Sequence, residues 1–407
     1  MKSSYKSLGK YIQPVVGRNI DLGNLPLMGL SIQKKFIPSI ANTIGTDMST
    51  YRIIERNQFA YGPVTSRNGD KITIALFNDY DRALISQAYM PFEVKDTNEL
   101  DPEYLMMWFR RPEFDRYARF KSHGSAREIF DWDEMCGTEL PVPSITKQRE
   151  IVKEYNTIQS RISLNQQLIQ KLEETAQAIY KQWFVEFEFP DENGKQYKSN
   201  GGKMEWNEEL EKEIPLDWTY EIISRISKEI ISGKTPPTEN DDNFGDYMPF
   251  VTIPDMHDRV FVDTSQRYLS KNGVTLQKNK TLPIGTICVS CIGTAGLVSI
   301  TAVECQTNQQ INSVICNEGV SIYYTYITLK GLGKQISEWG DKGSVGINMN
   351  KSEFSQMKIL IPRSNIMLKF EYSISPVFEL IKNYLKENRK LMELKELVLS
   401  KLASIEN

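Results

Sequence analysis

The chain has 407 residues, of which 40% are apolar, 10% aromatic and 25% charged. It is too long for one ordinary hydrophobic core, and its composition excludes disordered and collagen-like chains, so we expect two or more folded domains. The formal net charge of −3 excludes the simple argument that a basic protein binds nucleic acid. Because no apolar run reaches the roughly 18 residues of a membrane span and no signal-peptide core follows the first residues, we expect a cytoplasmic protein without a membrane partner.

Residues 1–143 are predicted to form one domain of mixed α and β structure. The run DKITIALF (residues 70–77) alternates apolar and polar side chains, which is typical of a strand. The run PEYLMMWFRRPEFDRYAR (residues 102–119) has the apolar spacing of a helix. Short strands combined with helices favour the α+β class.

A long amphipathic helix is predicted over residues 144–187. It follows Pro143 and starts with the capping candidates Ser144 and Thr146. Steps of four and three residues define a seam in which nine of ten side chains are apolar, the pattern of a coiled coil. The seam residues are Ile151, Tyr155, Ile158, Ile162, Asn165, Ile169, Leu172, Ala176, Ile179 and Trp183.

The remaining chain is predicted to contain a linker, a second domain and a second long helix. Residues 188–218 are polar and rich in glycine, asparagine and charge, as linkers and surface loops are. Residues 219–362 again mix strand and helix signals, and residues 363–407 are helical. Eight of ten seam residues in this last helix are apolar: Phe370, Ile374, Val377, Ile381, Tyr384, Asn388, Leu391, Lys395, Val398 and Leu402.

The second half of the chain repeats the first at a shift of about 220 residues. A Gly-Ser pair at 124–125 precedes the apolar run 140–143, and a Gly-Ser pair at 343–344 precedes the apolar run 359–362, in both cases 219 residues later. This duplication predicts a pseudo-twofold internal repeat. We therefore expect two related mixed α/β domains separated by two long antiparallel helices that form a coiled coil.

The two seams also predict a register. If the helices are antiparallel and their ends match, the residue numbers of facing positions sum to 553, which places Asn165 opposite Asn388 and Lys395 beside Ile158. Each seam contains a single asparagine, so the pair is a candidate register lock. The alternative is that the two asparagines are independent polar interruptions that face solvent or a partner.

Enzyme motifs are incomplete in this sequence. Residues 232–235 (Ser-Gly-Lys-Thr) resemble the end of a phosphate-binding loop, but Lys228 replaces the required glycine and Pro236 is incompatible with the following helix. The two histidines, His123 and His257, are not near a nucleophile signature. We expect no catalytic residue in this chain.

Five cysteines form no disulfide framework. They suit a reducing compartment, and the pair Cys288 and Cys291 lacks a second pair at zinc-finger spacing. Structural thiols are favoured over a metal site, so no metal is expected.

Both halves contain polar loops whose side chains suit base edges and phosphates. Each loop taken alone is an ordinary solvated loop, but their recurrence at corresponding places in both halves favours DNA binding. In the first half the candidate DNA-binding residues are Thr65, Ser66, Arg67, Asn68, Lys71, Lys121, Ser122, His123, Ser125 and Arg127. In the second half they are Lys234, Thr235, Ser290, Thr294, Asn308, Gln309, Gln310, Lys342, Ser344, Asn348, Asn350 and Lys351.

At these segments the chain resembles the specificity subunits of type I restriction-modification systems. The resemblance covers nearly the whole chain and includes GLSIQKKFIPSIANTIGTDMSTYRII, RFKSHGSAREIFDWDEM, KLEETAQAIYKQWFVEFEFP, SCIGTAG and GSVGINMNKSEF. It implies that each domain reads one half of a bipartite target in double-stranded DNA and that the helices set the gap. It further implies that the helices dock two modification (methyltransferase) subunits, with restriction (motor and nuclease) subunits added, and that S-adenosylmethionine, Mg and ATP belong to those partners and not to this chain.

Two other functions compete with this hypothesis. One is a self-contained DNA methyltransferase or nuclease with an unrecognised site. The other is a structural or regulatory coiled-coil protein without sequence preference. Activity of the purified chain would favour the first, and failure to select a DNA motif would favour the second.

Overall fold

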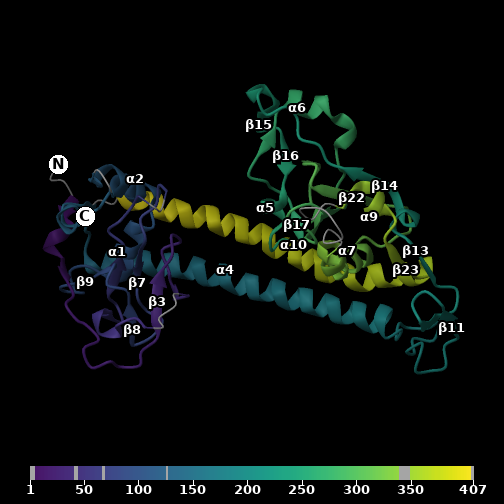
Figure 1. The fold of residues 1–407 in the computed structure, drawn as a ribbon, viewed down its shortest axis with the longest axis horizontal. Coiled ribbons are helices and arrows are strands. Elements are labelled where there is room, and N and C mark those ends of the chain that lie inside the picture. Colours follow the sequence, from purple (N-terminus) through teal and green to yellow (C-terminus); the bar gives the residue numbers. More distant parts are fainter. Residues whose placement is uncertain (1–4, 41–44, 67–68, 125–126, 339–348, 405–407) are drawn as a thin grey trace. The chain divides into compact units, whose positions relative to one another are not determined.

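The computed structural model describes the chain except residues 1–4, 41–44, 67–68, 125–126, 339–348 and 405–407. The chain divides into two compact units (Figure 1). Unit 1 consists of Met1–Asn165 and Lys386–Asn407, and unit 2 consists of Gln166–Leu385. Each unit therefore contains one mixed α/β part and a portion of both long helices.

Unit 1 contains two four-stranded sheets. The first has the antiparallel order β2 (Ile12–Pro14), β9 (Met90–Val94), β6 (Phe59–Tyr61) and β7 (Ile74–Leu76). The second has the order β4 (Phe36–Pro38), β3 (Leu27–Leu30), β8 (Arg82–Ile85) and β5 (Arg52–Glu55), in which β3 and β8 are parallel. A further ladder joins β1 (Tyr5–Ser7) to β10 (Glu139–Pro141).

The helix predicted over residues 102–119 is two helices, so that prediction is wrong in its extent. Helix α1 spans Pro102–Phe109, and helix α2 spans Pro112–Lys121. Pro112 lacks an N–H group and its ring would clash with the preceding turn, and it holds Arg111 in an extended conformation (ψ 137°). Proline at the first position of α2 breaks the helix and starts the next one. The third helix, α3, spans Trp132–Cys136.

Unit 2 repeats this plan. Its main sheet has the order β14 (Ser227–Ser232), β22 (Ile311–Cys316), β19 (Ile287–Ser290), β20 (Val298–Thr301) and β17 (Phe261–Val262), so the first four strands correspond to β2, β9, β6 and β7. The ladder of β13 (Thr219–Ile222) with β23 (Lys358–Ile361) corresponds to that of β1 with β10, and α9 (Lys351–Ser355) starts 219 residues after α3. The predicted duplication is confirmed at the level of topology.

The remaining elements of unit 2 form its second sheet and its short helices. The sheet has the order β15 (Phe244–Gly245), β18 (Tyr268–Leu269), β16 (Met248–Val251) and β21 (Gln306–Thr307). The short helices are α5 (Ile253–Met256), α6 (Lys271–Leu276), α7 (Ile322–Gly331) and α8 (Gly333–Glu338).

The segment predicted as a linker is more ordered than expected. It contains the hairpin of β11 (Met204–Asn207) and β12 (Lys212–Pro215). Phe189 and Trp218 from its two ends are buried in the core of unit 2, where their rings stack with centres 5.2 Å apart. The hydrophilic composition hid these apolar anchors.

The two long helices lie where the seams predict them. Helix α4 spans Ile145–Tyr180 and continues as a π-helical turn to Val185, and α10 spans Ser364–Lys401 and ends in a 3-10 turn at Ser404 (Figure 1). All twenty seam residues are buried or half-buried. Pro376 lies inside α10 without ending it. Among the helices of the described part, none has the length and apolar character needed to cross a membrane.

The register predicted from the seams is confirmed. In unit 1, Asn165 Nδ2 donates to Asn388 Oδ1 at 2.9 Å, and both side chains are buried. In unit 2, the rings of Trp183 and Phe370 are 5.6 Å apart. Lys395 reaches out of the seam and donates to Gln159 Oε1 at 3.2 Å, as a snorkelling lysine does.

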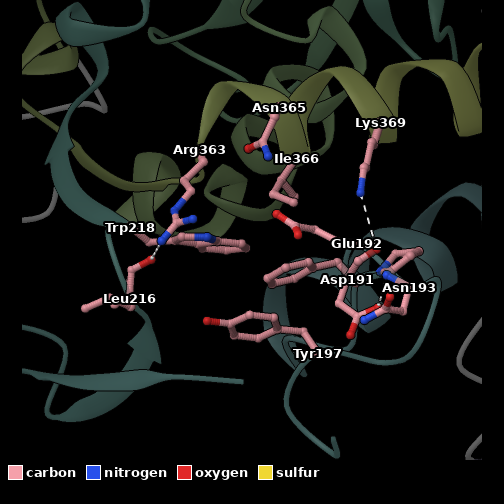
Figure 2. A pocket seen from close by; sticks show the side chains of 12 residues that line it. Asp191, Glu192, Asn193, Tyr197, Leu216, Trp218, Arg363, Asn365, Ile366 and Lys369 are labelled. Atoms are coloured by element: carbon pink, nitrogen blue, oxygen red, sulfur yellow. Dashed lines mark hydrogen bonds between the residues drawn. The ribbon is translucent and has the colours of Figure 1, made fainter. Parts of the chain in front are cut away.

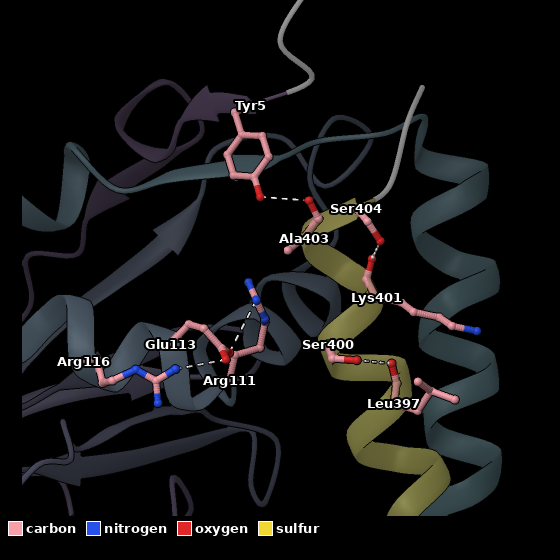
Figure 3. Close-up of polar contacts among 9 residues, drawn as sticks. All are labelled: Tyr5, Arg111, Glu113, Arg116, Leu397, Ser400, Lys401, Ala403 and Ser404. Atoms are coloured by element: carbon pink, nitrogen blue, oxygen red, sulfur yellow. Dashed lines mark hydrogen bonds and ion pairs between the residues drawn. The ribbon is translucent and has the colours of Figure 1, made fainter.

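The two ends of the chain meet within unit 1. The Tyr5 hydroxyl of β1 donates to the carbonyl oxygen of Ala403 at 2.9 Å, which ties the first strand to the end of α10 (Figure 3). Nearby, Arg111 is buried with its guanidinium 4.3 Å from the centre of the Trp108 ring, and Glu113 pairs with both Arg111 and Arg116. These contacts attach α10 to the mixed α/β part of the unit.

Candidate nucleic-acid interface

The two candidate loop regions of unit 1 lie side by side. Thr65 N donates to Glu128 O at 3.0 Å, and Phe130 N donates to Pro63 O at 2.8 Å. An isolated bridge also pairs Val64 with Ile129. Segments more than 50 residues apart in the sequence thus form one surface, as the sequence predicts for a shared binding face.

Cations of this surface are held by carboxylates. Lys121 Nζ lies 3.2 Å and His123 Nε2 3.4 Å from Glu134, so both use one carboxylate. Arg119 lies 3.0 Å from Glu128 and donates to the carbonyl oxygen of Gly69 at 3.3 Å. Arg119 was missed from the sequence because it is part of the helical pattern of α2 rather than of a polar loop.

Four separate segments of unit 2 form the corresponding surface. Lys234 N donates to Thr307 O at 2.9 Å, and Thr235 Oγ1 donates to Gln309 Oε1 at 2.7 Å. The buried Gln277 side chain donates to the carbonyl oxygen of Lys234 at 2.8 Å and thereby fixes the loop. These bonds orient the exposed Lys234 and Gln309 side chains before any ligand binds.

The other two segments join the same cluster. Cys291 N donates to Gln310 O at 2.8 Å, and Met349 N donates to Cys291 O at 3.0 Å. Helix α9 follows, and Asn350 caps it by accepting from Glu353 N at 3.0 Å. The side chain of Asn350 therefore has a structural role that its sequence position did not indicate, although it is exposed.

The structure sorts the predicted DNA-binding residues by exposure. Three of them are wrong as direct contacts in this conformation, because Thr65, Ser290 and Asn308 are buried. Their polar groups bond within the protein: Ser290 Oγ donates to Thr294 O at 2.7 Å, and Asn308 Nδ2 donates to Gln310 Oε1 at 2.9 Å. The exposed candidates are Ser66, Lys71, His123, Arg127, Lys234, Thr294, Gln309, Asn350 and Lys351, and the half-buried ones are Lys121, Ser122, Thr235 and Gln310.

Six predicted residues lie outside the described part of the chain. They are Arg67, Asn68, Ser125, Lys342, Ser344 and Asn348. Their contribution to DNA binding stays a prediction.

The cysteine pair is buried in unit 2. Cys288 and Cys291 are each 1% exposed, and burial raises the pKa of both thiols to about 11. The neutral thiol is thus favoured at neutral pH, whereas a metal ligand is a thiolate. Over the described ranges, no three His, Cys, Asp or Glu side chains come together in a way that could hold a metal ion.

A separate pocket of about 280 Å³ lies at the start of α10, away from the candidate loops (Figure 2). Phe189, Tyr197 and Trp218 form an aromatic stack along one side. Arg363 pairs with Asp217, and Lys369 Nζ donates to the carbonyl oxygen of Asp191 at 3.4 Å. None of the candidate DNA-binding residues lines it.

Comparison with known families settles the relationship of the chain. Residues 2–174 and 221–404, most of the chain, match the family model of the type I restriction modification DNA specificity domain. The chain belongs to this family. Two copies of the domain match, in agreement with the duplicated topology of units 1 and 2.

Individual relatives are similar along most of their length. The chain is 29% identical to the type I restriction enzyme HindI specificity subunit of Haemophilus influenzae over 423 aligned positions, covering 91% of both chains. It is 25% identical to the MjaIX specificity subunit of Methanocaldococcus jannaschii, covering 74% of this chain and 68% of that subunit. The crystal structure of a type I restriction-modification S subunit from M. genitalium has the same fold, with a TM-score of 0.57, 13% identity, and coverage of 99% and 96%.

Proposed function

We propose that this chain is the DNA-recognition subunit of a type I restriction-modification complex and that each unit reads one half of a bipartite target. The observation that carries the proposal is the repetition of one surface: each unit of the duplicated fold gathers its own cluster of exposed cationic and amide side chains from separate loops. Membership of the specificity-domain family supports it.

The side chains on these surfaces suit recognition in the major groove. Arginine pairs with guanine, and glutamine with adenine, through two hydrogen bonds, while lysine and hydroxyl groups suit phosphates. The bond from Thr235 to Gln309 fixes the orientation of the Gln309 amide, so less side-chain freedom is lost on binding. Arg127 and Lys71 are the exposed candidates in unit 1.

The paired helices α4 and α10 set the length of the unread gap and dock the modification subunits in this proposal. The modification and restriction subunits supply catalysis and bind S-adenosylmethionine, Mg and ATP. The antiparallel register supports a fixed spacing, because the Asn165–Asn388 bond prevents the helices from sliding without burying an unpaired amide. The described part of this chain contributes recognition rather than chemistry.

Replacing one exposed cation in each unit tests the division of labour. We expect Arg127→Ala to weaken or relax only the first half-site and Lys234→Ala only the second. A base-reading arginine is worth about 1–3 kcal/mol and its loss relaxes one position, whereas a phosphate-binding lysine lowers affinity for all sequences. The measurement is selection from randomised duplexes by the complex with the modification subunits, followed by binding titration of each half-site variant.

Arg56→Ala and Lys334→Ala are matched controls, because both side chains form ion pairs outside the candidate loops. They are expected to leave both half-sites unchanged. If Arg127→Ala or Lys234→Ala alters both half-sites equally, the chain does not read DNA with two independent units.

The competing function is a self-contained DNA methyltransferase or nuclease. It is tested by incubating the purified chain with DNA, Mg and labelled S-adenosylmethionine. We expect neither cleavage nor methyl transfer until the modification subunit is added. Activity of the chain alone would establish the competing function.

A further inference from the structure

A buried ion pair in unit 1 brings three other cations together. Lys34 is 6% exposed, and its Nζ lies 2.8 Å from Asp115 Oδ1 and also donates to the carbonyl oxygen of Phe109. Asp115 in turn accepts from Ile72 N at 3.2 Å. The sequence neighbours of Lys34, Phe109 and Ile72 are Lys35, Arg110 and Lys71, so these three cations meet around one buried anchor.

The cations continue onto the paired helices. The guanidinium of Arg110 lies 5.6 Å from the centre of the Tyr155 ring on α4. One turn further along α4, Gln159 accepts from Lys395 of α10 at 3.2 Å. Lys35, Lys71, Arg110 and Lys395 thus form a basic strip that runs from the candidate loop at residues 65–71 to the helices, entirely within unit 1.

The charges of the basic strip are not neutralised by nearby carboxylates. Asp115 is occupied by Lys34, and within the described residues no ion pair joins any of the four strip cations to an acid. Burial lowers the pKa of Lys395, an effect that Glu396 opposes and that Arg110 and Lys35 increase. In contrast, Arg119 and Lys121 on the neighbouring candidate surface each have a carboxylate partner.

Gathered like charges repel one another, and an anionic ligand relieves this repulsion. In a chain whose net charge is −3, such a strip is a local feature rather than a consequence of composition. Its continuity with Lys71, at the end of a candidate DNA loop, favours the same polyanion that the loop would bind.

We propose that the basic strip binds the phosphate backbone of DNA next to the half-site read by unit 1, without reading bases. This inference rests on the proposed function and adds a sequence-independent contact to it. Lysine and arginine bind phosphates through charge and hydrogen bonds and carry no sequence information there. The strip would position the duplex so that the loops of unit 1 meet the correct bases.

The salt dependence of DNA binding tests the strip. The variant is Lys35→Gln, Arg110→Gln and Lys395→Gln together, in the full chain with its modification subunits. Each lost phosphate contact reduces the slope of log K against log salt by about 0.9, so the slope is expected to become shallower by about 2 to 3 between roughly 50 and 200 mM salt. This change is expected for a duplex with the target and for one without it, while the half-site preference stays unchanged.

The control triple is Lys147→Gln, Lys171→Gln and Lys382→Gln, which removes the same charge from lysines that are paired with Glu150, Glu174 and Glu379. A second variant, Lys35→Arg, Arg110→Lys and Lys395→Arg, keeps the charges and is expected to keep the slope. Thermal unfolding of both strip variants shows whether they fold. If the glutamine variant is unfolded, the three single substitutions, each with an expected slope change of about 0.9, replace it.

A slope change no larger than that of the control triple would overturn the proposal. So would weaker assembly with the modification subunits at an unchanged slope, because the strip would then bind an acidic protein surface. Failure of the proposed function is distinguishable: the unmodified complex would show no preference for any target, while the strip could still be measured on arbitrary duplex.

Discussion

Alanine at Gly124 is expected to abolish recognition of the first half-site, and alanine at Gly233 recognition of the second. A Cβ at Gly124 would lie 2.2 Å from the carbonyl oxygen of Arg127, and the φ of this residue is +134°, a region that only glycine adopts readily. A Cβ at Gly233 would lie 2.1 Å from the carbonyl oxygen of Asn308. Backbone atoms cannot yield at such distances without rearranging the loop.

We expect each substitution to cost at least about 2 kcal/mol of binding to its own half-site, or roughly 30-fold in affinity. Binding to the other half-site should change little, since the two glycines belong to different units. Titration of the complex with duplexes mutated in one half-site at a time gives both values.

Gly17→Ala and Gly331→Ala serve as controls, one in each unit. A Cβ at either position meets nothing within 4 Å, and neither residue has a positive φ. These variants are expected to bind like the unmodified chain. If Gly124→Ala and Gly233→Ala bind both half-sites normally, the loops around them do not contact DNA.

A single leucine at Asn165 or Asn388 is expected to destabilise the helix pair more than leucine at both positions. The two side chains are 0% and 4% exposed, and their hydrogen bond is 2.9 Å long. A single substitution leaves the other amide buried without its partner, at a cost of about 1–3 kcal/mol. The double substitution removes both polar groups and adds apolar surface, so its melting temperature should be higher than that of either single variant.

The double variant is expected to lose its unique register. Cysteines at positions 162 and 391 face each other in the native register and should crosslink in the unmodified chain. In the double leucine background, crosslinks from position 162 to position 398 would report a slip by one heptad. Additive effects in the double-mutant cycle, together with an unchanged crosslink pattern, would show that the asparagine pair does not lock the register.

The polar surface loops illustrate what sequence reasoning could not decide. Ser290, Thr65 and Asn308 have the same residue types as the exposed candidates, yet hydrogen bonds to distant segments bury them. Whether a serine faces solvent depends on which strand or turn packs over it, and that depends on contacts between residues far apart in the chain. Residue type alone does not contain this information.

The sequence by itself determined the duplication, the two long helices and their register. Seam periodicity is a local property that accumulates over many turns, and a single pairing of Asn165 with Asn388 then specifies the rest. Only the tertiary structure decided the composition of the basic strip, because Lys35, Lys71, Arg110 and Lys395 are brought together by the buried Lys34–Asp115 pair and by the packing of α1 on α4. Such long-range contacts arise from the packing of whole elements, which no local pattern encodes.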